Sequence, residues 1–211
     1  MVAKIIRWVW LSVQYMQIPR NLMWQWWHGL RLDASWRFSG LPLVYHAGGN
    51  NPFTRLVFSR LGRRSTISIG RDFRALSKPK YNSLGVIQKT LLRTASYGAE
   101  LIVGNNVGMS GCTVCACRSV RIGDDTLIGT GAIITDSDLH PIDPMARLRG
   151  ESGKAAPVKI GAAVFIGARA IILKGVTVGN GATIGAGAVV SKDIPANAIA
   201  VGNPARVINS K

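Results

Sequence analysis

The chain has 211 residues, a formal net charge of +16 and three cysteines. The length suits one domain with an extension, and the charge favours an anionic partner such as a membrane surface, a phosphorylated cofactor or a nucleic acid. No apolar run reaches the roughly 18–20 residues that cross a bilayer. We expect no signal peptide, because Arg7 interrupts the first apolar run and no small-residue cleavage site follows.

Residues 1–40 are predicted to form a tryptophan-rich, amphipathic helical extension. Five of the six tryptophans lie in residues 1–32, and Ile5, Ile6, Val9 and Val13 recur at helical spacing before Pro19. Aromatic side chains mixed with Lys and Arg are typical of a segment that lies in a membrane interface. Packing of the same helices against the rest of the chain, or at a subunit contact, remains an equal alternative.

A repeating domain is predicted for residues 41–211. Residues 41–58 look like strands and turns that begin it, and Ile67 with Ile69-Gly70 resembles one repeat. Residues 71–96 are irregular and basic, so we expect a loop or an insertion there. From Val103 to Ile134 a six-residue repeat returns, with one extra residue that predicts a bulge or longer turn near residues 115–119.

The three cysteines lie close together in this segment. Cys112, Cys115 and Cys117 cannot provide a disulfide framework, which favours a reducing compartment. A tetrahedral zinc site needs four ligands, and no fourth is nearby, so we favour small buried thiols over a metal site. The chain is therefore expected to be cytoplasmic, with a peripheral place at the inner membrane face as the alternative for its extension.

The strictest pattern runs through residues 157–190. Every sixth residue is a branched aliphatic, and the residue two places before it is small or β-branched; the aliphatic set is Ile160, Ile166, Ile172, Val178, Ile184 and Val190. Period six is that of a parallel β-helix, whereas an α-helix or an alternating strand has another period. Three repeats close a coil of 18 residues, so Ile160 should lie against Val178, Ile166 against Ile184 and Ile172 against Val190.

A polar loop, residues 136–157, interrupts the repeat. Long polar loops on a rigid scaffold often carry function, and His140 is the one histidine of three that lies in this loop. An imidazole can take a proton from an attacking hydroxyl and return it to a leaving thiolate. The carboxylate of Asp136 or Asp138 could accept a hydrogen bond from the second ring nitrogen and so fix the tautomer. A histidine in an exposed loop is as often without function, so the residues alone leave both interpretations open.

Several motifs follow one another in a characteristic order. They include IGDD at 122–125, DSDLHP at 136–141, GVTVG at 175–179, GAGAVV at 185–190 and GNPAR at 202–206. In this order they resemble the hexapeptide-repeat acyltransferases, and among these the sugar and polysaccharide O-acetyltransferases. The resemblance covers about residues 66–208.

The resemblance implies a left-handed parallel β-helix, a homotrimer with active sites between neighbouring subunits, acetyl-CoA as donor and no metal. His140 matches the catalytic general base, and the backbone N–H of Ala168 matches the donor that stabilises the oxyanion. The positions that match the pantetheine channel are Gly167, Ala168, Ala186, Ser191 and Lys192. Those that match the end near the nucleotide are Asn203, Pro204 and Arg206, and the cations Lys192 and Arg206 suit phosphate. Ser110 and Asp138 fall near the acceptor sugar.

The predicted function is therefore an acetyl-CoA-dependent O-acetyltransferase acting on a sugar hydroxyl of a cell-surface polysaccharide or its lipid-linked precursor. The cationic, tryptophan-rich start favours the lipid-linked acceptor. An N-acyltransferase of an amino sugar or amino acid, and a non-enzymatic β-helix scaffold, remain alternatives. A γ-type carbonic anhydrase would need three zinc-binding histidines where the repeat region has one, and no motif for reading nucleic acid is present.

Overall fold

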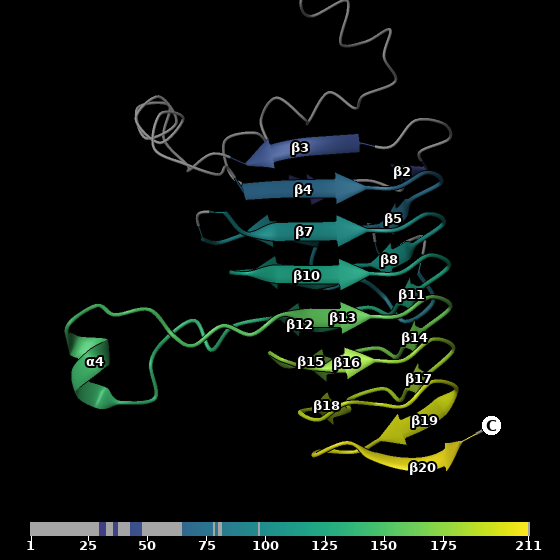
Figure 1. Ribbon diagram of the computed structural model, residues 1–211. Coiled ribbons are helices and arrows are strands. Elements are labelled where there is room, and N and C mark those ends of the chain that lie inside the picture. Colours follow the sequence, from purple (N-terminus) through teal and green to yellow (C-terminus); the bar gives the residue numbers. More distant parts are fainter. Residues whose placement is uncertain are drawn as a thin grey trace, which may run out of the picture.

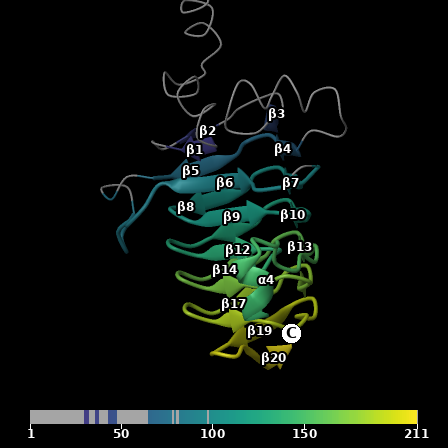
Figure 2. The same ribbon diagram turned by 90° about the vertical axis from the view of Figure 1, so that its left-hand side faces the viewer.

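The computed structural model describes residues 30–32, 36–37, 43–47, 65–77, 79, 82–96 and 98–210. Short strands wind around three faces of a prism, one coil above the next (Figures 1 and 2). We name the faces A, B and C after their three sheets. The chain passes from face C to face B to face A and then returns to face C one coil further on.

Face A has the strand order β1-β6-β9-β12-β15-β18, with β1 at Leu30–Leu32, β6 at Thr90–Thr94, β9 at Thr113–Ala116, β12 at Ile133–Thr135, β15 at Ile171–Ile172 and β18 at Val189–Val190. Face B has the order β2-β5-β8-β11-β14-β17-β19-β20, with β2 at Trp36–Arg37, β5 at Arg74–Leu76, β8 at Gly108–Ser110, β11 at Leu127–Ile128, β14 at Phe165–Ile166, β17 at Thr183–Ile184, β19 at Ala198–Val201 and β20 at Arg206–Ser210. Face C has the order β16-β13-β10-β7-β4-β3, with β3 at Leu43–Ala47, β4 at Ser65–Ile69, β7 at Glu100–Val103, β10 at Ser119–Ile122, β13 at Val158–Ile160 and β16 at Thr177–Val178.

The predicted register of the repeat is confirmed. Ile160 pairs with Val178, Ile166 with Ile184 and Ile172 with Val190, all in parallel ladders. These six side chains are at most 3% exposed and fill the inside of the prism. Branched aliphatics suit this place because their restricted χ1 rotamers pack well on a pleated surface.

The prediction that residues 71–96 are irregular is only partly correct. Strands β5 and β6 lie within this range and continue faces B and A, in register with β8 and β9. The insertion is limited to the segment between these two strands. Val86 in this segment is 8% exposed, and Thr130 donates a hydrogen bond to the carbonyl of Gly85, so the insertion is held against the coils at these two residues.

Antiparallel strands close both ends of the prism. Strands β1, β2 and β3 pair antiparallel with β6, β5 and β4, and β20 pairs antiparallel with β19. Strands β1 and β2 fall within the range predicted to be helical, and both are extended. The amphipathic helix predicted before Pro19 lies outside the described residues.

The loop that follows β12 projects from the prism and carries the short helix α4, Pro144–Leu148 (Figure 1). When the structure is turned, α4 lies in front of the edge between faces A and C (Figure 2). Among the described residues, no helix has the length and apolar character needed to cross a bilayer.

The buried column should dominate stability. We expect Ile166→Ala to lower the free energy of unfolding by about 2–5 kcal/mol, because Ile166 is 0% exposed and its loss leaves a cavity between coils. The same change at Ile142, which is 80% exposed, should have little effect. Urea denaturation measures both, and equal midpoints for the two variants would contradict the column as the main source of stability.

Candidate functional site

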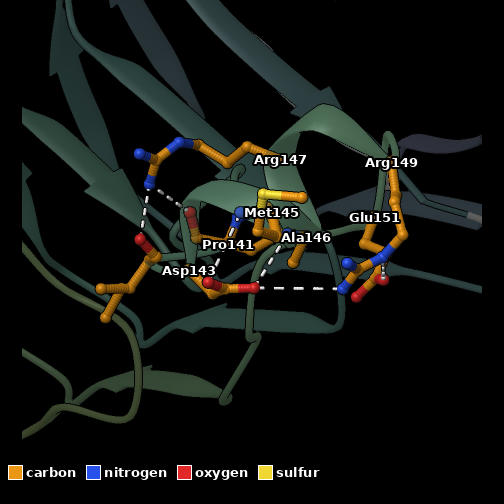
Figure 3. Close-up of polar contacts among 8 residues, drawn as sticks. Pro141, Asp143, Met145, Ala146, Arg147, Arg149 and Glu151 are labelled. Atoms are coloured by element: carbon orange, nitrogen blue, oxygen red, sulfur yellow. Dashed lines mark hydrogen bonds and ion pairs between the residues drawn. The ribbon is translucent and has the colours of Figure 1, made fainter.

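The tip of the projecting loop is organised by its own polar contacts (Figure 3). Asp143 caps α4 by accepting hydrogen bonds from the N–H groups of Met145 and Ala146, at 3.4 and 2.9 Å. The Arg147 guanidinium donates to the carbonyls of Pro141 and Ile142, at 2.9 and 2.6 Å. Arg149 pairs with Glu151 at 2.7 Å. The tip therefore keeps a defined shape although most of it is exposed.

His140 follows a tight turn at the base of this loop. The backbone N–H of His140 donates to the backbone carbonyl of Asp138, two residues earlier, at 2.6 Å. Leu139, which lies between them, has φ +61°. A γ-turn with a positive φ at a residue other than glycine is a strained conformation, and such strain is concentrated at functional sites. The imidazole is exposed, as a base that must reach a substrate needs to be.

The turn is supported by the two antiparallel segments that join the loop to the prism, which we call its first and second arms in chain order. Ser137 and Ala155 form a bridge, and the N–H of Asp138 donates to the carbonyl of Lys154 at 3.0 Å. A Cβ on Gly153 would lie 2.7 Å from the backbone nitrogen of His140. Only a glycine fits there, so the second arm packs directly on the backbone that carries the imidazole.

The tautomer role predicted for Asp136 is wrong. Asp136 is 0% exposed, and its carboxylate accepts three backbone N–H bonds from Cys117, Arg118 and Ser119, at 2.6, 2.7 and 2.6 Å. Both oxygens are therefore used by the turn of the preceding coil. This side chain fixes the point where the loop leaves the prism, and among the described residues no hydrogen bond joins it to the imidazole.

The carboxylate of Asp138 also has a partner other than the imidazole of His140. Its carboxylate accepts from the ammonium of Lys174 at 2.5 Å, and no hydrogen bond joins it to the imidazole of His140 in the described part of the chain. Lys174 lies in the turn between β15 and β16 and was not predicted as a site residue. In the six-residue pattern it occupies a turn position, which carries no chemical signal.

Most of the positions expected to bind the donor lie at the edge between faces A and B. Gly167 and Ala168 follow β14, Ala186 follows β17, and Asn203 and Pro204 follow β19. Ser110 ends β8 two coils earlier at the same edge. A Cβ on Gly167 would lie 2.6 Å from the nitrogen of Ala186, so glycine is needed for the coils to approach.

The backbone amides at the A–B edge are available as donors. The N–H groups of Ala168 and Ala186 have no acceptor among the residues that the structure describes. At the edge between faces C and B, by contrast, the equivalent N–H of Ala162 donates to Asn180 at 2.9 Å and that of Asn105 to Asp124 at 2.7 Å. The A–B edge therefore offers free donors where an acyl oxygen could bind.

The remaining candidates are elsewhere. Ser191 and Lys192 follow β18 at the A–C edge, the same edge as His140 and Lys174, and both are exposed. Arg206 begins β20, is exposed, and donates to the carbonyl of Ala205 at 2.9 Å. One chain thus places His140 at one edge of face A and the free amides at the other.

Cys115 and Cys117 lie beside the base of the loop, whereas Cys112 precedes β9 at the edge between faces A and B. Cys112 is 0% exposed, whereas Cys115 and Cys117 are half-buried. Burial raises the pKa of Cys112 to about 12, and burial together with the neighbouring Cys117 raises the pKa of Cys115 to about 11. Both thiols are therefore protonated at neutral pH and are poor nucleophiles.

Comparison with known proteins shows what the repeating part of the chain is similar to. The pattern described as "Hexapeptide repeat of succinyl-transferase" matches residues 157–192. Nodulation protein L of Rhizobium meliloti (strain 1021) is 44% identical over 113 residues, which are 53% of this chain and 60% of that protein. Galactoside O-acetyltransferase of Escherichia coli K12 is 39% identical over 114 residues, which are 54% of this chain and 55% of that protein.

Over the matched residues the chain is similar to hexapeptide-repeat acetyltransferases. The crystal structure of a hexapeptide-repeat-containing acetyltransferase from Vibrio cholerae aligns over 77% of this chain and 82% of that one, with a TM-score of 0.53 and 22% identity. This likeness concerns the fold, and it confirms the predicted left-handed parallel β-helix. The chain spans little more than half the length of the curated relatives that it matches.

Proposed function

We propose that this chain is a hexapeptide-repeat acyltransferase, and that it is an acetyl-CoA-dependent O-acetyltransferase whose acceptor is a sugar hydroxyl. The observation that carries the proposal is His140, presented by a strained turn on a loop that interrupts the prism. The relative from Escherichia coli is by name a galactoside O-acetyltransferase, which supports a sugar as acceptor.

The residues present suit this reaction. The imidazole of His140 takes the proton of the acceptor hydroxyl as that oxygen attacks the acetyl carbonyl, and returns it to the departing sulfur. The N–H of Ala168 donates to the acetyl oxygen as negative charge develops on it. Exposed Lys192 and Arg206 are suited to the phosphates of CoA, and the small side chains at Gly167, Ala168 and Ala186 leave room for the pantetheine arm.

We propose a homotrimer with shared sites, and the position of these groups supports sites that are shared between protomers. Because His140 and Ala168 lie at different edges of face A, a site that contains both is completed by a second protomer. The outer surfaces of faces A and B carry exposed apolar side chains: Leu127 and Phe165 are each 49% exposed, and Ile133 is 39% exposed. Face C carries Arg121 and Lys159 at outward positions, and both are exposed. Faces A and B are therefore the surfaces suited to subunit contact.

The first test of the function is the removal of the base. We expect His140→Ala to lower acetyl transfer by about 10²–10⁴-fold without loss of fold, because proton transfer is lost while the prism is untouched. Release of free thiol from acetyl-CoA, with methyl β-galactoside and maltose as acceptors, measures the rate. The control is His46→Ala, the same substitution in β3, which is the end strand of face C. Equal turnover for His140→Ala and the wild type would contradict the assignment.

Mixed trimers test whether sites are shared. His140→Ala and Ala186→Trp, the latter at an exposed position meant to block the channel, should each be nearly inactive alone. When the two variants are assembled together in equal amounts, about a quarter of wild-type activity should return. A shared site works only when one protomer supplies an intact His140 and its neighbour supplies an intact Ala186, and each of these two conditions is met in half of the cases. Mixed assemblies that stay inactive would show that one protomer supplies the whole site.

We also propose that the acceptor is a lipid-linked precursor of a cell-surface polysaccharide, and that the protein acts in the cytoplasm at the inner face of the membrane. The net charge of +16 and the tryptophans with Lys and Arg in residues 1–32 support this location.

A vesicle experiment tests the membrane proposal. The full chain should sediment with anionic phosphatidylserine vesicles more than with neutral phosphatidylcholine vesicles, and less at high salt. Removal of residues 1–29, which leaves β1 in place, should abolish this difference. Unchanged sedimentation of the shortened chain would remove the membrane role of the extension.

A further inference from the structure

We propose that Lys174 is a positioning residue, which holds the His140 turn in its working place through the carboxylate of Asp138. The inference rests on the proposed acetyl transfer, in which His140 is the base. Lys174 itself is not required to touch the acetyl group or the acceptor.

The loop has few ties to the prism beyond its two roots. The side-chain hydrogen bonds and ion pairs described for residues 139–151 all stay within the loop, among them those of Asp143, Arg147 and Arg149. The pair between Lys174 and Asp138 joins residues 36 positions apart and connects the loop to the next coil. Among the described contacts of residues 137–153, it is the one side-chain hydrogen bond or ion pair that does so.

The pair lies at the root of the turn that presents the imidazole. The carbonyl of Asp138 accepts the N–H of His140 at 2.6 Å, so a movement of Asp138 is passed directly to His140. Leu139 is held at φ +61°, a conformation that relaxes unless its surroundings fix it. Gly153 packs against the same backbone from the other arm. Lys174 thus opposes relaxation on the side that faces the prism.

The environment makes the pair effective. The side chains of Lys174 and Asp138 are 32% and 26% exposed, so water screens their attraction less than it does for an exposed pair. Lys174 is anchored on the rigid turn between β15 and β16, where the N–H of Gly175 donates to the carbonyl of Ala156 at 2.9 Å. Both the lysine and the second arm of the loop are therefore fixed to the same coil.

The experiment compares Lys174→Met, which keeps the length but removes the charge, with Lys174→Arg, which keeps the charge. Lys159→Met, at an exposed position on face C, is the matched control. For each full-length protein we would measure kcat and KM with acetyl-CoA, using methyl β-galactoside and maltose as acceptors. We would also measure hydrogen exchange of the backbone amides in residues 137–140 and 153–156, without any ligand.

We expect Lys174→Met to lower kcat by roughly 10²-fold with the KM for acetyl-CoA little changed, since the base is misplaced while donor binding is kept. Exchange of the His140 and Asp138 amides should be faster by about tenfold, because local opening of the turn becomes easier. Lys174→Arg should restore most of kcat and of the protection, and Lys159→Met should resemble the wild type.

Three results would overturn the inference. Unchanged exchange in Lys174→Met would show that the pair does not hold the turn. A fall in kcat without a change in exchange would assign Lys174 to the substrate instead. Failure of Lys174→Arg to restore kcat would exclude charge as the cause. If the wild type transfers no acetyl group to any acceptor, the proposed function fails, while the exchange results still support or overturn the tie between Lys174 and the loop.

Discussion

The close stacking of one coil on the next is the constraint on which the rest of the structure depends. At the turns, backbone lies on backbone: a Cβ on Gly123 would lie 2.6 Å from the nitrogen of Ala162, and one on Gly70 would lie 2.6 Å from the carbonyl carbon of Gly104. Parallel ladders then align the inward Ile and Val side chains of successive coils. Because a coil gains its hydrogen bonds from its neighbours, residues can be added only where the chain turns between faces. The two long insertions, between β5 and β6 and between β12 and β13, both lie at such turns, and the ladders on each side keep their register.

This constraint explains what the sequence could predict. Six repeats in one phase from Ile160 to Val190 define the inward column, and each predicted pairing is present. Strands β5 and β6 could not be predicted, because the insertion between them breaks the period: Ile69 pairs with Val103, far outside one coil of 18 residues. The antiparallel strands β1, β2 and β3 carry no repeat at all, since their partners lie on one side only.

The candidate site was predictable in part for the same reason. A loop that interrupts a strict repeat is visible in the sequence, and His140 could be selected as its one histidine. The roles of Asp136 and Asp138 could not be separated, because the two residues differ only by their place on the arm. Asp136 points into the preceding turn and accepts three backbone N–H bonds, whereas Asp138 points to the following coil and meets Lys174. Lys174 could not be selected, because its position 36 residues away becomes adjacent only when the coils are stacked.

The division of the candidate site between two edges follows from how rigid the coils are. Face A separates the A–C edge, which carries His140, Lys174 and Lys192, from the A–B edge, which carries the small residues and the free amides of Ala168 and Ala186. A prism held by continuous ladders and a filled interior cannot bend to bring two of its edges together. The chemistry proposed here needs a base and an oxyanion donor on the same acetyl group, within about 3 Å of the reacting atoms. The apolar outer surfaces of faces A and B offer a way to meet that need, because association through them lets the loop of one protomer serve the amides of the next. Assembly would then be part of the catalytic site, and the rigidity that keeps the edges apart within one chain would fix their distance between two.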